Sequence, residues 1–341
     1  MIQNAIARLL EGTNLSREDA REVMDQVMRG EATPAQIAGF LVALRAKGET
    51  VEEIAGCAEA MRSHALPVHP ERDDVIDTAG TGGDGSGTVN ISTAAALVAA
   101  AAGAAVAKHG NRAVSSACGS ADVLEALGFD IELAPEEIAR SIDSLGFGFL
   151  FAQAHHPAMR HAGPVRRELA TRTVFNILGP LTNPAGAGRQ VVGVYSADLT
   201  EKVAEALSGL GTHRAMVVHG ADGIDELSPA GVNLVYHVNG KVEREELDPA
   251  DLGIPRRSPG ELAGGTPLEN AAAINSVFAG VPGAKRDAVV LNAAAALFVA
   301  ELVGDLRDGV ILASAAIDSG AAADRLGALV SFSRMERAEA S

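Results

Sequence analysis

The fold is decided by one stretch, Val75-Ile76-Asp77-Thr78-Ala79-Gly80-Thr81-Gly82-Gly83-Asp84-Gly85-Ser86-Gly87-Thr88-Val89-Asn90-Ile91-Ser92-Thr93. Its β-branched start predicts a strand, and five glycines follow within eight residues. Capping side chains end the stretch and precede an alanine-rich helix expected from Ala94 onward. Glycine lets an anion approach main-chain N–H groups, and a helix N-terminus adds unpaired N–H groups. Linkers are also glycine-rich, but they are not usually fixed between a strand and a capped helix, so the stretch predicts a phosphate-binding loop.

Two other phosphate loops share part of this glycine pattern. Gly80, Gly82 and Gly85 satisfy the dinucleotide pattern G-x-G-x-x-G. That pattern opens directly into a helix, whereas here seven residues lie between Gly85 and Thr93. The dinucleotide pattern also needs an acidic residue at the end of the next strand, and the strand expected at 104–108 ends in Lys108. A Walker loop is excluded because no Gly-Lys-Ser/Thr follows the glycines.

Length, composition and net charge indicate how many domains the protein has and which kinds of partner it can bind. The 341 residues favour two domains, and 47% hydrophobic residues are ample for a core. A net charge of −16 argues against general nucleic-acid binding, which needs a basic face. Cys57 and Cys118 are too few for a disulfide framework. The start of the chain does not resemble a signal peptide, and the longest apolar run, 94–107, is too short to span a bilayer. We therefore expect a cytoplasmic protein.

Two secondary-structure patterns divide the chain. Residues 1–65 predict short helices only, whereas strands and helices alternate from Val75 onward, which predicts a largely parallel sheet covered by helices. Further strands are expected at 104–108, 147–151, 191–195 and 214–219, an antiparallel hairpin at 234–238 and 241–245, and three alanine-rich helices at the end. One helical segment without a strand signal, 155–185, interrupts the alternation and could pack on the N-terminal helices.

One polar cluster, Lys108-His109-Gly110-Asn111-Arg112-Ala113-Val114-Ser115-Ser116, follows a predicted strand. The carboxyl ends of strands are where α/β sheets bind ligands. Lys108 and Arg112 could bind phosphate oxygens, and the hydroxyls of Ser115 and Ser116 could donate to them. An ordinary polar surface loop is the alternative, but so many hydrogen-bonding groups within nine residues favour a binding role.

Acidic and basic pairs complete the set of candidate side chains. Asp225 and Glu226 follow the strand predicted at 214–219, where adjacent carboxylates suit Mg²⁺ or form an acidic turn. Arg166 and Arg167 could grip a carboxylate through paired hydrogen bonds or could be solvated helix residues. No Ser-His-Asp or Cys-His set and no zinc-ligand spacing is apparent. We therefore expect chemistry that depends on positioning and charge stabilisation.

The sequence resembles the anthranilate phosphoribosyltransferase family over essentially its whole length. The motifs that carry the resemblance are Gly80-Thr81-Gly82-Gly83-Asp84, Asn90-Ile91-Ser92-Thr93, Lys108-His109-Gly110-Asn111-Arg112, Gly119-Ser120-Ala121-Asp122, Phe175-Asn176-Ile177-Leu178-Gly179-Pro180-Leu181-Thr182-Asn183-Pro184 and Asp225-Glu226. The implied fold is α/β, with a small discontinuous all-helical domain and a large α/β domain around a mostly parallel sheet, as in pyrimidine nucleoside phosphorylases. The helical domain would span 1–70 with part of 155–185, and the α/β domain 71–154 and 186–341.

The resemblance also implies a reaction and the residues that serve it. A homodimer would use Mg²⁺ to transfer phosphoribose from 5-phosphoribosyl 1-diphosphate to anthranilate, with no covalent nucleophile or general base assigned. The phosphoribosyl diphosphate would bind to Gly80, Gly83, Asp84, Thr88, Asn90, Ser92, Thr93, Lys108, Ser116 and Ser120. The metal would bind to Ser92, Asp225 and Glu226. Anthranilate would bind to Gly80, Asn111 and Arg166, with His109 and His156 lining its route, and Ile91, Gly110, Arg112 and Ser115 complete the substrate-binding set.

Two other functions are consistent with the predicted fold. A pyrimidine nucleoside phosphorylase usually has a longer chain and a lysine-rich phosphate signature in place of this glycine loop. A nucleic-acid-binding relative without activity would be basic and would lack Asn111 and Arg166, whereas this chain is acidic and has both residues.

Overall fold

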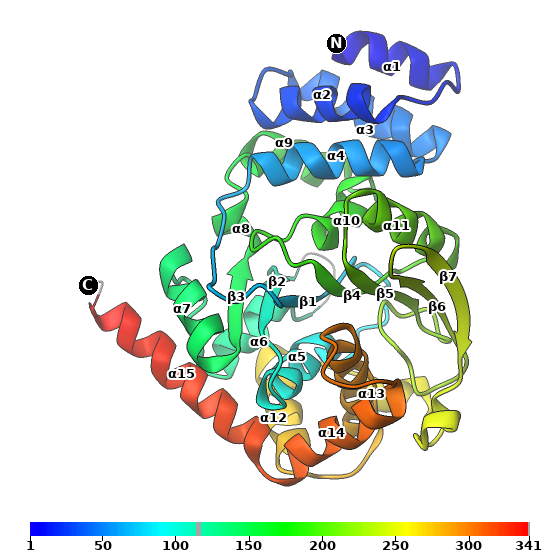
Figure 1. The fold of residues 1–341 in the computed structure, drawn as a ribbon. Helices are drawn as coiled ribbons and strands as arrows, with labels where there is room; N and C mark the ends of the chain where they lie inside the picture. The colour runs from blue at the N-terminus through cyan, green and yellow to red at the C-terminus, as the bar shows by residue number, and fades with distance from the viewer. Residues whose placement is uncertain (114–116, 340–341) are drawn as a thin grey trace.

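The computed structural model describes residues 1–113 and 117–339, so the predicted ligands Ser115 and Ser116 lie outside the described residues. A layer of N-terminal helices lies on one side of a twisted sheet, and the helices that follow the glycine-rich stretch and those at the end of the chain lie on the other (Figure 1). The predicted class, a helical part joined to an α/β part with a mostly parallel sheet, is confirmed.

The N-terminal layer consists of α1 (Ile2–Leu10), α2 (Arg17–Met28), α3 (Pro34–Lys47) and α4 (Val51–Ser63). The last two helices begin at reciprocal caps, in which Thr33 pairs with Gln36 and Thr50 pairs with Glu53. Helix α2 packs on α4 and α1 packs on α3, and the apolar side chains of all four helices are buried in one core, which explains why four short helices form a stable layer.

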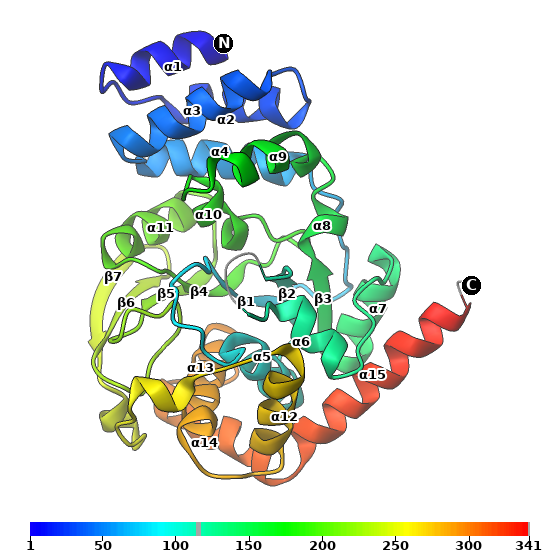
Figure 2. The ribbon, with the colours of Figure 1, turned by 180° about the vertical axis from the view of Figure 1, so that it is seen from behind.

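The segment that interrupts the strand pattern folds as short helices: α8 (Ala152–His155), α9 (Met159–Leu169), α10 (Phe175–Leu178) and the 3₁₀ helix η1 (Gly179–Leu181). Ala162, Val165 and Leu178 are buried in the same hydrophobic core as the N-terminal helices. Helix α9 packs against α2 and α3, and both views place it in the layer of N-terminal helices (Figures 1 and 2). We propose that part of this segment and residues 1–70 form one helical domain, and that 71–154 with 186–341 form the α/β domain.

The sheet has the strand order β3-β2-β1-β4-β5-β6-β7. Its strands are β1 (Ile76–Gly80), β2 (Val106–Gly110), β3 (Phe147–Phe151), β4 (Arg189–Gly193), β5 (Arg214–His219), β6 (Asn233–Val238) and β7 (Val242–Leu247). The first five strands in this order run parallel, and the predicted hairpin β6–β7 adds two antiparallel strands at one edge. The central strand β1 therefore delivers the glycine-rich stretch to the middle of the sheet's carboxyl edge.

The remaining helices are α5 (Ile91–Ala101), α6 (Ser120–Ala126), α7 (Pro135–Leu145), α11 (Ala197–Gly209), α12 (Pro267–Phe278), α13 (Ala284–Val299), α14 (Leu306–Asp318) and α15 (Ala321–Glu339). Two short 3₁₀ helices, η2 (Pro249–Leu252) and η3 (Pro259–Leu262), lie between the hairpin and α12. The first helix after the glycines begins at Ile91, not Ala94, because the main chain already turns helical at the polar residues expected to cap it. The chain ends in four helices, not three, since Gly320 in the left-handed region separates α14 from α15.

Two predicted strands are displaced by two residues. The strand expected at 104–108 is β2 at 106–110, because Val106 is the first residue to pair with β3. The strand expected at 191–195 begins earlier, at Arg189 of β4, which pairs with Ile76 of β1. Arg189 and Gln190 gave no strand signal because they are polar, yet Gln190 is buried and donates to the Pro180 carbonyl (2.7 Å).

Hydrophobic side chains form two cores, one on each face of the sheet. One core lies between the sheet and α5, α7 and α13, and the other joins α11 and the opposite face of the sheet to the N-terminal helices. Cys57 and Cys118 are both buried and not disulfide-bonded. Within the part of the chain that the structure describes, no helix is long and apolar enough to cross a membrane.

Candidate active site

The glycine loop, residues 80–90, lies across the carboxyl edge of the sheet. Gly82, Gly83, Gly85 and Gly87 have φ values of 65°, 73°, 76° and 63°, a region that favours glycine. At the start of the loop, the Thr81 N–H donates to the carbonyl of Gly193 in β4 (2.9 Å). Further along, the Val89 N–H donates to the Leu262 carbonyl (2.9 Å). The loop is thus fixed near both ends, while its glycines keep main-chain groups open to a ligand.

Two adjacent carboxylates meet this loop from the segment that follows β5. Asp225 accepts a hydrogen bond from the Gly82 N–H (2.6 Å), and Glu226 accepts one from the Ser92 N–H at the start of α5 (3.1 Å). Burial and the charge of Asp84 raise the pKa of Asp225 to about 6, and burial beside Asp225 raises the pKa of Glu226 to about 8. The fold therefore holds two carboxylates together where both are costly to ionise without a cation.

Close packing accounts for the glycines that flank this pair. A Cβ on Gly80 would lie 2.3 Å from Asp225 Oδ2, and a Cβ on Gly193 would lie 1.6 Å from the Asp225 carbonyl oxygen. Gly80 and Gly193 pair with each other in the parallel ladder of β1 and β4. Only glycine at these two strand ends leaves room for Asp225. The acidic segment therefore restricts the last residue of both β1 and β4 to glycine.

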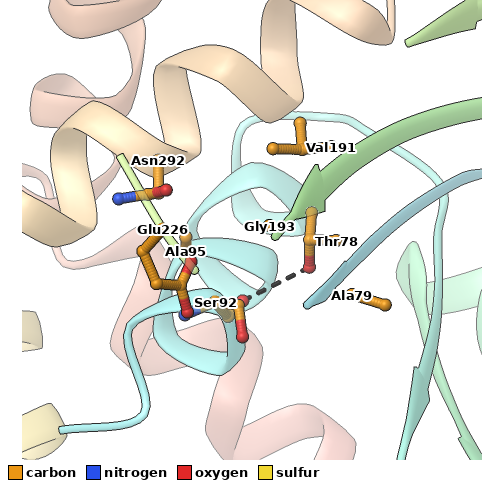
Figure 3. A pocket seen from close by; sticks show the side chains of 8 residues that line it. All are labelled: Thr78, Ala79, Ser92, Ala95, Val191, Gly193, Glu226 and Asn292. Carbon is orange, nitrogen blue, oxygen red and sulfur yellow. Dashed lines mark hydrogen bonds between the residues drawn. The ribbon is translucent and has the colours of Figure 1, made fainter. Parts of the chain in front are cut away.

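The oxygen donors around Glu226 suit Mg²⁺. Glu226, Ser92 and Thr78 line a cavity of about 10 Å³, and the Thr78 hydroxyl donates to the Ser92 carbonyl at 3.3 Å (Figure 3). Among the described residues no three His, Cys, Asp or Glu side chains converge as a closed metal site. Mg²⁺ is commonly held by one or two carboxylates together with substrate phosphates and water. The Asp225–Glu226 pair fits that open form of site.

Lys108 lies beneath the glycine loop and does not extend into solvent. The side chain is 1% exposed, and its ammonium group donates to the Thr78 carbonyl (2.6 Å) and to Ser92 Oγ (3.3 Å). Burial lowers the pKa of Lys108, while Asp77, Glu226 and Asp225 oppose that change. Lys108 thus offsets part of the negative charge of the carboxylate pair from the β2 side.

A buried Asp77–Asn183 contact supports this arrangement and was missed by sequence reasoning. Asp77 accepts hydrogen bonds from the His109 N–H (3.1 Å) and from Asn183 Nδ2 (2.7 Å), and Asn183 also donates to the Ala107 carbonyl (2.8 Å). Burial raises the pKa of Asp77 to about 6. A carboxylate inside an otherwise buried strand was the available signal, since such a group requires partners.

Two neutral histidines, one of them in β2 itself, lie side by side near the carboxyl end of that strand. The rings of His109 and His156 lie 5.1 Å apart, and His109 Nδ1 lies 3.1 Å from the Gly179 carbonyl oxygen, so its proton is on that nitrogen. Burial lowers the pKa of His109 to about 3 and that of His156 to about 4. Within the described residues neither Nε2 atom has a hydrogen-bond partner. At neutral pH, His109 Nε2 is therefore a free acceptor.

The residues after His109 fold back onto the start of α6. The Ser120 hydroxyl donates to the Asn111 carbonyl (3.2 Å), and a Cβ on Gly110 would lie 2.2 Å from Ser120 Oγ. Arg112 is turned toward α6, where it pairs with Glu125 (2.8 Å) and Asp122 (3.2 Å). The structure thus places Asn111 and Ser120 together, while the Arg112 guanidinium is bound to carboxylates of its own chain.

The other predicted ligands lie in or near the glycine loop. Asp84 accepts the Ser86 hydroxyl (2.6 Å), and Thr88 forms a main-chain bridge to Ala263. The Asn90 amide is occupied by Asn270 Nδ2 (2.9 Å) and the Cys118 carbonyl (3.2 Å). The side chains of Ile91 and Thr93 are buried beneath the loop. Asn90 and Ile91 therefore shape the loop, and any ligand contact of Ile91 would use its main chain.

Two arginines of the 155–185 segment stack on aromatic rings, and one of them contacts the glycine loop. The Arg166 guanidinium lies 5.1 Å from the centroid of the Phe175 ring, and in the described residues it forms no ion pair. Burial lowers the pKa of Arg166. A guanidinium is nevertheless protonated at neutral pH in proteins, so Arg166 can pair with a carboxylate. Arg172, which sequence reasoning missed, stacks over the Tyr195 ring (4.2 Å) and donates to the Gly83 carbonyl. Arg172 therefore links the helical layer to the glycine loop.

The fold and the site together define a class of enzyme. The helical bundle domain of the glycosyl transferase family matches residues 3–65, and the a/b domain of that family matches residues 72–323. The matched parts include the glycine loop, the β2 cluster and the acidic pair. The chain is thus a glycosyl transferase of this two-domain type.

Whole-length relatives narrow the class. Anthranilate phosphoribosyltransferase of Anaeromyxobacter dehalogenans strain 2CP-C is 55% identical over 331 residues, which cover 97% of this chain and 98% of that protein. The enzyme of Acetivibrio thermocellus is 52% identical, with coverage of 97% and 96%. The crystal structure of the Thermus thermophilus enzyme matches with a TM-score of 0.92, 50% identity and coverage of 97% and 99%. The chain belongs to the anthranilate phosphoribosyltransferase family.

A more distant relative has been solved with ligands. Anthranilate phosphoribosyltransferase of Saccharomyces cerevisiae, in complex with PRPP and Mg, matches with a TM-score of 0.90, 28% identity and coverage of 98% of both chains. Neither of the two other functions weighed from the sequence, a nucleoside phosphorylase or a nucleic-acid-binding protein, is favoured by these relatives.

Proposed function

We propose that this chain transfers the phosphoribosyl group of 5-phosphoribosyl 1-diphosphate to the amine of anthranilate, a step of tryptophan biosynthesis. The observation that carries the proposal is the contact of the glycine loop with the Asp225–Glu226 pair at the carboxyl edge of the sheet. In the reaction, the bond from the ribose C1 carbon to the diphosphate breaks, a bond from C1 to the anthranilate nitrogen forms, and the amine loses one proton. No residue is assigned as a covalent nucleophile or general base.

The phosphoribosyl diphosphate would lie over the glycine loop and the start of α5. We assign its binding to Gly80, Gly83, Asp84, Thr88, Asn90, Ser92, Thr93, Lys108, Ser116 and Ser120, of which Ser116 lies outside the described residues. The glycine N–H groups and the helix N-terminus suit phosphate oxygens. Lys108 would act as a buried positive charge beneath the loop and would not reach out to the phosphate as an extended side chain, since its ammonium already donates to Thr78 and Ser92.

Asp225, Glu226 and the Ser92 hydroxyl would hold Mg²⁺. The cation would neutralise the charge that develops on the departing diphosphate. The protein's own part is to keep the two carboxyl groups adjacent and in contact with the glycine loop and the start of α5. Burial raises the pKa values of both carboxyls, and the charge of Asp84 adds to this effect at Asp225 as that of Asp225 does at Glu226. The ionised pair would therefore be more stable with a bound cation than without one.

Anthranilate would enter between the helical layer and the end of β2. We assign its carboxylate to Arg166, whose planar guanidinium matches a carboxylate and stays charged. Asn111 and Gly80 would contact the ring or its substituents. His109 and His156 would line the route. Because the His109 ring is neutral, its Nε2 atom would accept a hydrogen bond from the amine.

The proposal is tested by mixing the protein with phosphoribosyl diphosphate, Mg²⁺ and anthranilate and following the loss of anthranilate fluorescence. We expect loss that depends on all three additions and releases one diphosphate for each anthranilate consumed. Unchanged fluorescence with folded protein would refute the assignment. Phosphorolysis of a pyrimidine nucleoside under the same conditions would instead support the phosphorylase alternative.

We also propose that the chain forms a homodimer through its helical layer. Leu10 of α1 is 73% exposed and Val42 of α3 is 45% exposed, so the outer helices present apolar side chains to their surroundings. Sedimentation equilibrium would distinguish a dimer from a monomer of 34.8 kDa.

Arg166→Ala is expected to raise the Michaelis constant for anthranilate and to leave that for phosphoribosyl diphosphate nearly unchanged. Loss of a charge-assisted hydrogen bond costs on the order of 1.5–3 kcal/mol, which corresponds to a roughly tenfold to hundredfold rise. The measurement is a titration of each substrate at saturating concentration of the other.

Arg167→Ala is the matched control. Arg167 is the next residue along α9 and is exposed, so the same loss of charge there should change neither constant by more than about twofold. A rise in the constant for phosphoribosyl diphosphate in Arg166→Ala would show that the carboxylate assignment is wrong.

A further inference from the structure

The segment that carries Asp225 and Glu226 has no regular secondary structure, so other contacts must fix it. On its N-terminal side, the carbonyl of Ile224 accepts the Gly220 N–H (2.8 Å). On its C-terminal side, Leu227 is buried with no exposed surface. The two carboxylates are thus carried by a two-residue span between buried anchors. Their direction depends on how firmly each anchor is held.

Asn292 holds the C-terminal anchor. Its Oδ1 accepts the Leu227 N–H (3.0 Å), and its Nδ2 donates to the Leu227 carbonyl (2.8 Å) and to the Ala288 carbonyl one helical turn earlier (2.9 Å). One side-chain amide therefore satisfies both main-chain groups of Leu227 in the way that a neighbouring strand would. Figure 3 shows Asn292 and Glu226 lining the same small cavity.

A buried polar side chain in the interior of helix α13 is unfavourable unless its amide finds hydrogen-bond partners. The residues around Asn292 are Leu291 and a run of alanines, all buried, and Asn292 itself is 3% exposed. Asparagine is less favourable than alanine in a helix interior, and burying an amide without partners is costly. Alanine or leucine would suit the helix better, but neither could bond both groups of Leu227.

We propose that Asn292 is a positioning residue that fixes the Asp225–Glu226 pair for a divalent cation. The inference rests on the metal-binding role proposed above for that pair. The cavity of about 10 Å³ between Asn292, Glu226 and Ser92 holds one water molecule at most, so the span has little room to adopt a second arrangement. Loss of the amide would free Leu227 and let the carboxylates turn away from the glycine loop.

The test measures Mn²⁺ binding in the presence of inorganic diphosphate by electron paramagnetic resonance, without either substrate. Loss of an outer-shell partner typically weakens metal binding by about 10- to 100-fold, and we expect the dissociation constant of Asn292→Ala to rise by that factor. In steady-state assays the Mg²⁺ activation constant should rise in parallel, while the Michaelis constant for anthranilate stays within about twofold at saturating Mg²⁺.

Ser141→Ala is the control for a loss of buried hydrogen bonding elsewhere. The Ser141 hydroxyl is fully buried and donates to the Phe147 carbonyl (2.7 Å), far along the sequence from the acidic pair. A purely structural role of Asn292 would make both variants less stable to heat and leave both Mn²⁺ constants at the wild-type value, which would overturn the inference.

Asn292→Asp provides a second variant if Asn292→Ala does not fold. It keeps the size of the side chain and the acceptor for the Leu227 N–H but replaces the amide donor with an oxygen, so a weaker Mn²⁺ complex is again expected. Wild-type affinity in folded Asn292→Asp would count against the inference. Failure of the wild-type protein itself to bind Mn²⁺ with diphosphate would overturn both the metal assignment and the inference that rests on it.

Discussion

The double variant Asp225→Asn, Glu226→Gln is expected to lose at least about a thousandfold in kcat/KM at millimolar Mg²⁺. Metal stabilisation of a leaving group supplies several kcal/mol, and each ~1.4 kcal/mol is a factor of about ten in rate. The amides match the carboxylates in size and can still accept hydrogen bonds from Gly82 and Ser92, so the fold should persist. What they lack is the negative charge that binds the cation.

Thermal unfolding separates this loss from misfolding. Burial raises the pKa values of both carboxyls, which means that their ionised forms are destabilising in the metal-free protein. We therefore expect the double variant to melt no earlier than the wild type at pH 8 without metal. Asp222→Asn serves as the control, because no hydrogen bond joins that residue to the glycine loop within the described residues. Turnover of the wild type in excess chelator would disprove the metal requirement.

Gly193→Ala is expected to reduce activity by roughly a hundredfold or more and to lower the melting temperature. The added Cβ would lie 1.6 Å from the Asp225 carbonyl oxygen, a contact that no side-chain rotation can relieve. Either β4 or the acidic span must move, although β4 is fixed in the ladder with β1 and its Gly193 carbonyl holds Thr81. Misplacement of catalytic groups by about 1 Å can cost on the order of a hundredfold.

Gly188→Ala is the control, because it makes the same substitution at a position where the added methyl group has room. Gly188 lies just before β4, and a Cβ there would meet only His213 Cβ at 3.9 Å. We expect its activity and melting temperature to be close to those of the wild type. If Gly193→Ala were as active as Gly188→Ala, the acidic span would have to be more yielding than its packing indicates.

Sequence patterns predicted the elements that local chemistry determines. The strand, glycine loop and helix of residues 76–101, the hairpin of β6 and β7 and the capped helices of the N-terminal layer all have local signals, and all are present. The acidic pair was placed at the glycine loop through the family resemblance. The ends of β2 and β4 were misplaced because strand pairing, which depends on distant residues, decides where a strand begins.

The missed residues share one property: each acts through a partner far away in the chain. Asp77 bonds Asn183, Arg172 bonds Gly83 and Asn292 bonds Leu227. A single sequence shows no such pairs, since nothing in the spacing of Asn292 and Leu227 links them. Arg112 is predicted to bind phosphate because it is a cation beside a binding loop. The structure pairs it with Asp122 and Glu125 of α6, contacts that the sequence did not indicate, and its role toward phosphate stays a prediction.

On the face of the sheet that the N-terminal helices cover, the hydrophobic core is continuous from α2 through α9 and α11 to the side chains of β4 and β5. Met24, Leu178, Val192 and Val217 thus belong to one packed body, although they come from both parts of the family pattern. A chain cut between residues 65 and 72 would leave two fragments that each expose half of an apolar interface. The boundary between the two family models therefore marks a change of architecture along the chain and not a seam along which the molecule comes apart.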